Sequence, residues 1–159
     1  MRSILQVLGN IRPGPATNVA RVCHDLAETI KARGMVILIS DLLDGGADAD
    51  GAGTADALLA LRHFRHRKHD VIVFHLLDDS EIDLPFDELS NFRDVESGAR
   101  LAVDPAVFRN IYRRRVQAFI DDFRQGCTQT SIDYKLVRTS QPIEAVLSEY
   151  LHFRARRSR

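Results

Sequence analysis

Three short apolar runs dominate the pattern of hydrophobic and polar positions along the chain, at residues 35–40, 71–77 and 132–137. In the first two runs (MVILIS and VIVFHLL) nearly every position is apolar, which is typical of strands buried on both faces in a parallel sheet. The third run (IDYKLV) alternates between apolar and polar positions, as a strand nearer the edge of a sheet does. The pattern therefore predicts three strands, with the third the most peripheral.

Apolar residues at steps of three and four predict four helices around these strands, over about residues 19–33, 54–68, 105–125 and 142–151. Asp104 and Pro105 are the expected N-cap and first-turn residue of the third helix. Gly126 is expected to end that helix, and Gly34 to end the first. Helices and strands therefore alternate along most of the chain.

This alternation predicts an α/β fold: a three-layer, mostly parallel sheet with helices on both faces, in a Rossmann-like arrangement. One interruption precedes the third helix, where Asn91–Val103 has two alternating runs around a Glu-Ser-Gly turn and predicts an inserted β-hairpin. A chain of 159 residues suits one domain, which we place at residues 1–153. The arginine-rich residues 154–159 are expected to form a basic tail that frays.

Charge and composition argue against several classes of function. Lysine plus arginine (22) equals aspartate plus glutamate (22), so no overall field draws the protein to nucleic acid. No run approaches the about 18 apolar residues of a membrane span, and the N-terminus lacks a signal-peptide pattern. The two cysteines, Cys23 and Cys127, form no Cys-x-x-Cys pair and are expected to be reduced thiols in or beside the core. We therefore expect a cytoplasmic protein without a membrane span.

Polar residues follow each predicted strand, at Ser40-Asp41, Asp78-Asp79 and Thr139-Ser140. In open parallel sheets ligands bind at this carboxyl edge, although turn chemistry also favours such residues. Thr17 lies just before a helix, where N-capping is the ordinary explanation, and it gains interest only together with Asp41. Phosphate-loop, dinucleotide-binding and nucleophile-elbow motifs are all missing from the sequence.

Two further motifs carry no metal chemistry. The loop DGGADADGAG over residues 44–53 fits a calcium-binding EF-hand loop only in part, because the first ligand and the final glutamate of that motif are both missing. His63, His66 and His69 lie in HFRHRKH, which we interpret as the solvated, basic end of a helix rather than a zinc site.

The segments PGPATN, GMVILISDLLD, HDVIVFHLLD and IDYKLV, with the hairpin that ends in VDP, resemble the bacterial von Willebrand factor A-like family called domain of unknown function 58. The resemblance covers about residues 5–151 and is most specific at ILISDLLD and VIVFHLLD. It implies a partial von Willebrand factor A-like fold and a metal-ion-dependent adhesion site in which Thr17 and Asp41 take the places of the threonine and aspartate ligands. The Asp-x-Ser-x-Ser motif of that site is missing from the 159 residues. The resemblance thus implies a degenerate site that binds Mg²⁺ or Mn²⁺ weakly or not at all, and no other cofactor.

The resemblance also implies that the strand over residues 35–40 has lost its neighbour and is an exposed edge. Such an edge can pair with another chain, so its residues are the expected interaction site: Met35, Val36, Ile37, Leu38, Ile39 and Ser40. The expected function is a non-enzymatic protein-interaction module that forms a homodimer or binds a partner, which in this family is a MoxR-type AAA+ ATPase. Two alternatives stay open: a metal-dependent hydrolase using Asp41, Asp78 and Asp79, and a gene fragment without a function of its own.

Overall fold

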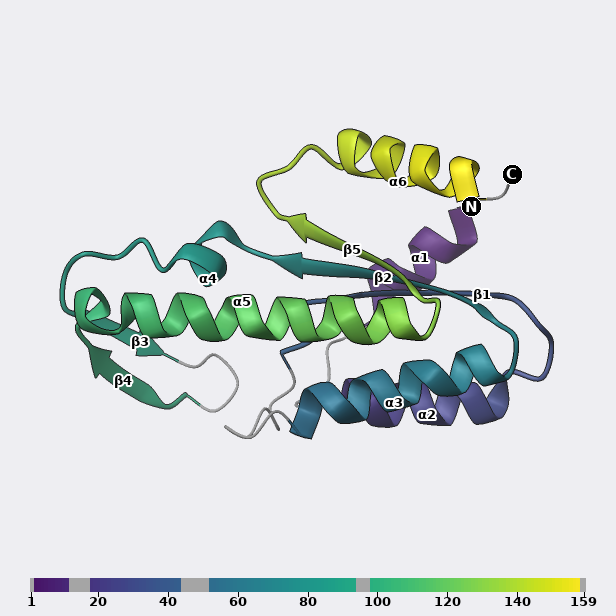
Figure 1. The fold of residues 1–159 in the computed structure, drawn as a ribbon, viewed down its shortest axis with the longest axis horizontal. Coiled ribbons are helices and arrows are strands. Elements are labelled where there is room, and N and C mark those ends of the chain that lie inside the picture. Colours follow the sequence, from purple (N-terminus) through teal and green to yellow (C-terminus); the bar gives the residue numbers. More distant parts are fainter. Residues whose placement is uncertain (1, 12–17, 44–51, 94–97, 158–159) are drawn as a thin grey trace.

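The protein has a mixed α/β fold in which a parallel sheet lies between two layers of helices (Figure 1). The computed structural model describes residues 2–11, 18–43, 52–93 and 98–157. The sheet strands are β1 (Met35–Ser40), β2 (Asp70–Leu77) and β5 (Asp133–Arg138), and a separate antiparallel hairpin consists of β3 (Ser90–Arg93) and β4 (Arg100–Val103). The helices are α1 (Arg2–Asn10), α2 (Val19–Thr29), α3 (Ala52–His66), α4 (Asp79–Asp83), α5 (Pro105–Gln129) and α6 (Ile143–Arg157). The predicted α/β class and the inserted hairpin are confirmed.

β2 is the central strand of the sheet, whose order is β1-β2-β5. Both pairings are parallel: Val36 lies opposite Val71, and Val73 lies opposite Tyr134. β2 is buried along nearly its whole length, as its continuous apolar sequence predicts. β5 forms one edge of the sheet, which agrees with its alternating pattern. β1 forms the other edge among the described residues, although its sequence is nearly as apolar as that of β2.

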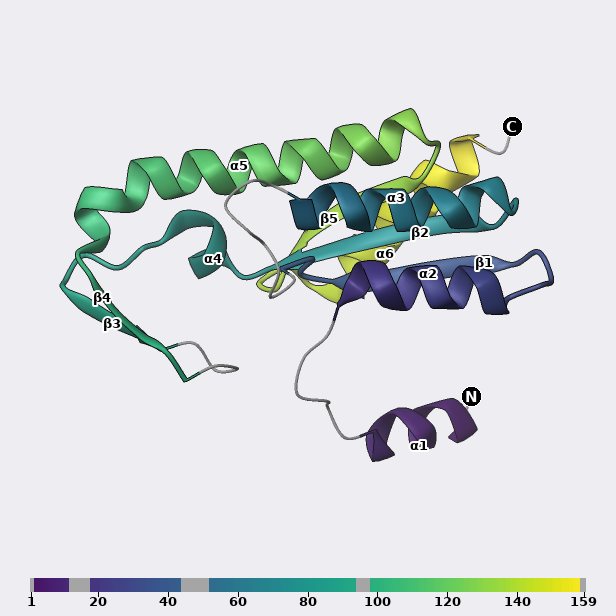
Figure 2. The same cartoon turned by 90° about the horizontal axis from the view of Figure 1, so that it is seen from below.

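Each face of the sheet has its own apolar core. α2, α3 and α5 cover one face, where Phe64, Phe123 and Val73 are fully buried. α6 covers the other face, and its side chains Val146 and Tyr150 pack against residues of β2 and β5: Ile72, Phe74 and Val137. Figures 1 and 2 show α2 and α3 on the opposite side of the sheet from α6. The sheet is therefore the middle of three layers, as predicted.

β1 is covered on one face only. Val36 and Leu38 pack against the core formed with α2 and α3. On the opposite face Met35, Ile37 and Ile39 are 57%, 51% and 64% exposed, because α6 packs over β2 and β5 and leaves β1 bare. β1 thus has a row of exposed apolar side chains and one edge beside which no other described strand lies.

α1 was not predicted from the sequence. Its apolar side chains are exposed, and Figure 2 shows the helix standing apart from the three layers, on the side where β1 is the outermost strand. The exposed positions include Ile4, Leu5, Val7 and Leu8. A helix with an unpacked apolar stripe gains little stability from its own chain.

Two helices run past the ends that the sequence predicts. α5 continues through Gly126 to Gln129, because this glycine is buried against α3 and the Leu58 side chain fills the space beside its Cα. Gly126 therefore serves close helix packing rather than helix termination. α6 continues to Arg157, beyond the expected start of a basic tail at residue 154, and Arg154 forms an ion pair with Asp70 at the start of β2.

The interpretation of the histidine-rich segment holds for the end of α3 but is wrong for His69. His63 lies in the last turn of α3, where its Nε2 is 3.2 Å from a Glu28 carboxylate oxygen. His69 comes after the helix and is buried, and its Nδ1 accepts a hydrogen bond of 3.2 Å from the Gly34 amide. This bond joins the turn before β1 to the turn before β2. His69 is therefore part of the packed structure and not of a solvated helix end.

The N-terminal half of α5 extends past the sheet and carries the hairpin and α4 beside it (Figure 1). Asp104 caps the helix by accepting a hydrogen bond of 3.0 Å from the Ala106 amide, and Pro105 occupies the first turn, as predicted. Of the helices in the described ranges, none is both long enough and apolar enough to cross a bilayer.

Candidate functional site

The carboxyl ends of β2 and β5 bring Asp78, Asp79, Arg138 and Thr139 together. Thr139 Oγ1 donates a hydrogen bond of 2.6 Å to Asp78 Oδ2, which joins the two strand ends directly. Ligands of open parallel sheets bind at this edge, so it is the first place to look for chemistry. The residues singled out after these two strands in the sequence do meet in the structure.

Asp78 is fully engaged as the N-cap of α4. Its Oδ1 accepts hydrogen bonds from the Ser80 amide at 2.9 Å and the Ser80 hydroxyl at 2.6 Å. Glu81 completes a capping box, because its carboxylate accepts a bond of 2.7 Å from the Asp78 amide. Hydrogen bonds from the Ser80 hydroxyl first, from the Thr139 hydroxyl next and then from the Ser80 amide lower the pKa of Asp78 from 3.8 to about 2. Such a carboxylate is a weak base near neutral pH.

Arg138 links the end of β5 to α4. Its Nη1 lies 2.8 Å from Asp79 Oδ1 and 3.1 Å from Asp83 Oδ2. Hydrogen bonds from Ser140 and then Arg138 lower the pKa of Asp79, and the two carboxylates raise the pKa of Arg138. The three side chains are 40–45% exposed, so solvent screens the ion pairs and their contribution to stability is small. The cluster is a contact between α4 and the end of β5.

Removing one of the hydroxyl donors should return the Asp78 carboxyl toward ordinary acidity. We expect Thr139→Val to raise the pKa of Asp78 from about 2 toward 3.8, and Ser80→Ala to raise it further, because Ser80 supplies the largest stabilisation of the charged form. Side-chain carboxyl chemical shifts followed by NMR through an acid titration measure this directly. An Asp78 pKa that stays unchanged in both variants would show that these hydroxyls do not hold the carboxylate.

His75 connects the centre of the sheet to the turn after β1. It is fully buried, and its Nε2 lies 2.9 Å from the main-chain oxygen of Asp41, while its Nδ1 lies 2.8 Å from the Tyr134 hydroxyl. A carbonyl oxygen only accepts, so Nε2 must carry the proton and Nδ1 must accept from the tyrosine. Burial lowers the pKa of His75 from 6.5 to about 4, and its contacts with Asp41 offset only part of this effect. The neutral imidazole is therefore a fixed bridge from β5 through β2 to the Asp41 turn.

The turn at Asp41 is held tightly by its own chain. The Leu43 amide donates to Asp41 Oδ1 at 3.1 Å, and the Leu42 amide donates to the Ser40 hydroxyl at 3.0 Å. Leu42 is buried and has a φ of 58°, a left-handed conformation that is uncommon for residues other than glycine, asparagine and aspartate. The buried Leu42 side chain and the His75 bond hold the main chain of this turn, and the Leu43 amide holds the Asp41 carboxylate.

The described residues do not fit a magnesium site on their own. Thr17, the expected partner of Asp41, lies outside the described residues, as does most of the DGGADADGAG loop. Across the described ranges there is no group of three or more His, Cys, Asp or Glu side chains that could share a metal ion. Asp78 and Asp79, which follow β2, are occupied by hydroxyl and guanidinium donors. Magnesium prefers six oxygen ligands, and the Asp41 carboxylate alone supplies too few of them to hold the ion.

Several residues that shape this edge were not identified from the sequence. His75 is a polar residue inside the otherwise apolar run VIVFHLL, and that exception was a usable signal of a buried hydrogen-bond network. The Asp-x-x-Glu spacing at Asp78 and Glu81 was a readable capping box. Nothing in the sequence indicated that Arg138 would bind two carboxylates, because an arginine at a strand end is common on protein surfaces.

Comparison with known proteins places the chain in a family. Residues 1–120 match the family model described as "Protein of unknown function DUF58", which covers well over half of the chain. Neither the curated proteins nor the solved structures contain a significant match to it. The match includes β1, β2, the hairpin and most of α5, so the chain belongs to the DUF58 family of proteins of unknown function.

Proposed function

We propose that this protein is a non-enzymatic interaction module that uses β1 to bind another polypeptide, in the first instance a second copy of itself. The observation that carries the proposal is the exposure of β1 at the edge of the sheet. Among the strands that the structure describes, β1 has β2 as its single neighbour, and it exposes Met35, Ile37 and Ile39. Sheet edges pair readily with an added strand, because the unpaired backbone groups then gain hydrogen-bond partners.

The chemistry of β1 suits pairing with a second copy. Natural proteins protect exposed edges with charges, prolines or bulges. The sequence of β1, MVILIS, contains no charged residue and no proline. Two copies that meet edge to edge would also bring their bare apolar faces side by side, which removes further apolar surface from water. The rigid Asp41 turn, held by His75, fixes the carboxyl end of the strand for this contact.

The resemblance seen in the sequence adds a further step to this proposal. By resemblance the fold is von Willebrand factor A-like, the Asp41 edge is a degenerate adhesion site, and the biological partner is a MoxR-type AAA+ ATPase. β1 and the Asp41 turn are adjacent in the chain, so one partner surface can contact both. The hydrolase alternative, with Asp41, Asp78 and Asp79, receives less support, because their carboxylate oxygens already accept internal hydrogen bonds.

The proposal is tested by the oligomeric state of charged β1 variants. We expect size-exclusion chromatography with light scattering to show a dimer of the wild-type chain at micromolar concentration. Ile37→Lys combined with Ile39→Lys should give a monomer, because lysines on an edge strand oppose pairing. Leu59→Lys is the matched control, since Leu59 is 64% exposed on α3 and lies away from β1. A wild-type monomer, or a dimer that survives both lysines, would count against the proposal.

A further inference from the structure

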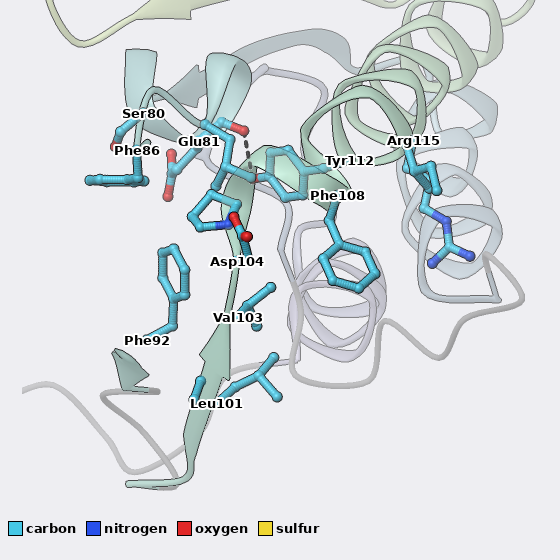
Figure 3. A pocket seen from close by; sticks show the side chains of 14 residues that line it. Ser80, Glu81, Phe86, Phe92, Leu101, Val103, Asp104, Phe108, Tyr112 and Arg115 are labelled. Atoms are coloured by element: carbon cyan, nitrogen blue, oxygen red, sulfur yellow. Dashed lines mark hydrogen bonds between the residues drawn. The ribbon is translucent and has the colours of Figure 1, made fainter. Parts of the chain in front are cut away.

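A second apolar surface lies far from β1, where the hairpin meets α4 and the start of α5. It is a groove of about 920 Å³, and Figure 3 shows its lining side chains around a common open space. Aromatic rings come from three separate elements: Phe86 from the loop after α4, Phe92 from β3, and Phe108 from α5. We name it the hairpin groove.

The hairpin groove is open and only partly covered by its own chain. Phe108 and Ile111 are 50% and 56% exposed on α5, and Leu101 of β4 is exposed as well. Phe92 and Leu101 are paired across the hairpin and both line the groove. Exposed apolar patches of this kind, with polar residues around them, mark interaction sites on monomeric proteins.

Internal hydrogen bonds fix the wall of the groove formed by α4 and its following loop. Tyr112 donates to the Glu81 main-chain oxygen at 2.6 Å, and Arg113 Nε donates to that of Asp83 at 2.7 Å. Arg109 donates to the main-chain oxygens of Leu84 and Phe86, at 3.0 and 2.6 Å. The groove is therefore a preformed surface, which lowers the entropic cost of binding.

Arg115 differs from Arg109 and Arg113, whose guanidinium groups are engaged by the loop after α4 and by α4 itself. It lines the groove and is exposed, yet it has no hydrogen bond or ion pair with any residue in the described ranges. Figure 3 shows its guanidinium at the end of the groove beyond Phe108, while the carboxylates of Glu81 and Asp104 lie toward the opposite end. The groove thus has an unpaired positive charge at one end and negative charge at the other.

We propose that the hairpin groove binds an amphipathic helix of a partner protein, with an acidic side chain of that helix on Arg115. From Asp104 to Arg115 the first turns of α5 span about 16 Å, enough for about three turns of a bound helix. The apolar face of the helix packs on Phe92, Phe108 and Ile111, in the helix-in-groove mode. Its positively polarised N-terminus faces Glu81 and Asp104, and its negative C-terminal end faces Arg115.

The charges at the two ends of the hairpin groove favour a helix over a lipid as its ligand. A fatty acid or an anionic membrane would satisfy Arg115 but would place apolar chain or further negative charge against Glu81 and Asp104. A helix with opposite charges at its two ends satisfies both ends of the groove. This surface shares no residue with β1, so the proposal stands apart from the proposed function.

A displayed library of helical peptides about 11 residues long, selected on the full chain, tests the proposal. We expect enriched peptides with an apolar face and an acidic residue near the C-terminus, with affinities then measured by fluorescence anisotropy. Arg115→Glu should weaken these peptides about tenfold or more, while the adjacent Arg114→Glu, which changes net charge equally, should have little effect. Phe108→Ser with Ile111→Ser should abolish binding, and Leu59→Ser is its control on another surface.

Several outcomes overturn the proposal. The proposal is wrong if the selection yields no binders, or if the selected peptides lack the acidic residue. It is also wrong if the peptides bind the Arg115→Glu and Arg114→Glu variants equally well. Binding of anionic phospholipid vesicles that Arg115→Glu removes would identify a lipid surface instead. The outcome is independent of β1, because Ile37→Lys should leave peptide binding intact, and the Phe108 and Ile111 variants should leave the dimer intact.

Discussion

We expect the free energy of unfolding to fall by about 3 kcal/mol through His75 alone as the pH is lowered from 6.5 to about 4. Burial lowers the pKa of His75 in the folded protein, whereas the unfolded chain keeps the ordinary value of 6.5. Over this window the unfolded state takes up the proton first, so acid favours unfolding. The stability that the neutral imidazole provides is complete above pH 6.5 and is lost as the pH approaches the folded-state value.

Urea unfolding of the wild-type chain and of His75→Gln across this pH range measures the effect. The glutamine variant should lose stability at neutral pH but should show a shallower decline in acid, because it cannot take up the proton. Tyr134→Phe is a second probe, since loss of the hydroxyl donor to Nδ1 should raise the pKa of His75 and also flatten the curve. Parallel curves for all three proteins would rule out His75 as the source of acid sensitivity.

Replacing Gly126 by alanine should destabilise the protein by up to about 2 kcal/mol, because adding a methyl group to a well-packed core costs about 1–3 kcal/mol and alanine regains up to about 1 kcal/mol over glycine within a helix. A Cβ at this position would lie 2.5 Å from Leu58 Cδ1 and 2.8 Å from Leu58 Cδ2, inside van der Waals contact. α5 and α3 would have to separate, or Leu58 would have to leave its rotamer. Thermal and urea unfolding of the variant measure the loss.

The double variant shows whether the Leu58 contact is responsible. Leu58→Ala removes the clashing atoms, so its effect and that of Gly126→Ala should be strongly non-additive. Gly9→Ala is the matched control, because a Cβ at Gly9 meets no atom within 4 Å and the change favours a helix. Simple additivity of the two substitutions would contradict the packing described for Gly126.

The main architecture could be predicted because the apolar runs of the strands and the capping residues of the helices are strong local signals. The apolar runs of β1 and β2 and the Asp104-Pro105 start of α5 were predicted correctly. Gly126 was misread, because a glycine that stops a helix and a glycine that admits a neighbouring helix are identical in a single sequence. The helical pattern of α1 was overlooked, although Ile4 and Leu8 lie four residues apart.

The candidate site was predicted in outline only. Which residues follow each strand is readable from the sequence, so Asp41, Asp78 and Thr139 were singled out. What those residues bind depends on contacts between segments far apart in the chain, such as Asp78 with Thr139 and His75 with Tyr134. The hairpin groove could not be predicted, because it depends on how the hairpin packs against α5.

In hydrogen–deuterium exchange over a range of protein concentrations, we expect the β1 amides pointing away from β2 to exchange rapidly in dilute protein and to become protected as the concentration rises, while Ile37→Lys removes this protection. β1 amides that are as protected as those of β2 at every concentration, or that stay unprotected at all of them, would contradict an exposed β1 edge that pairs with a second copy.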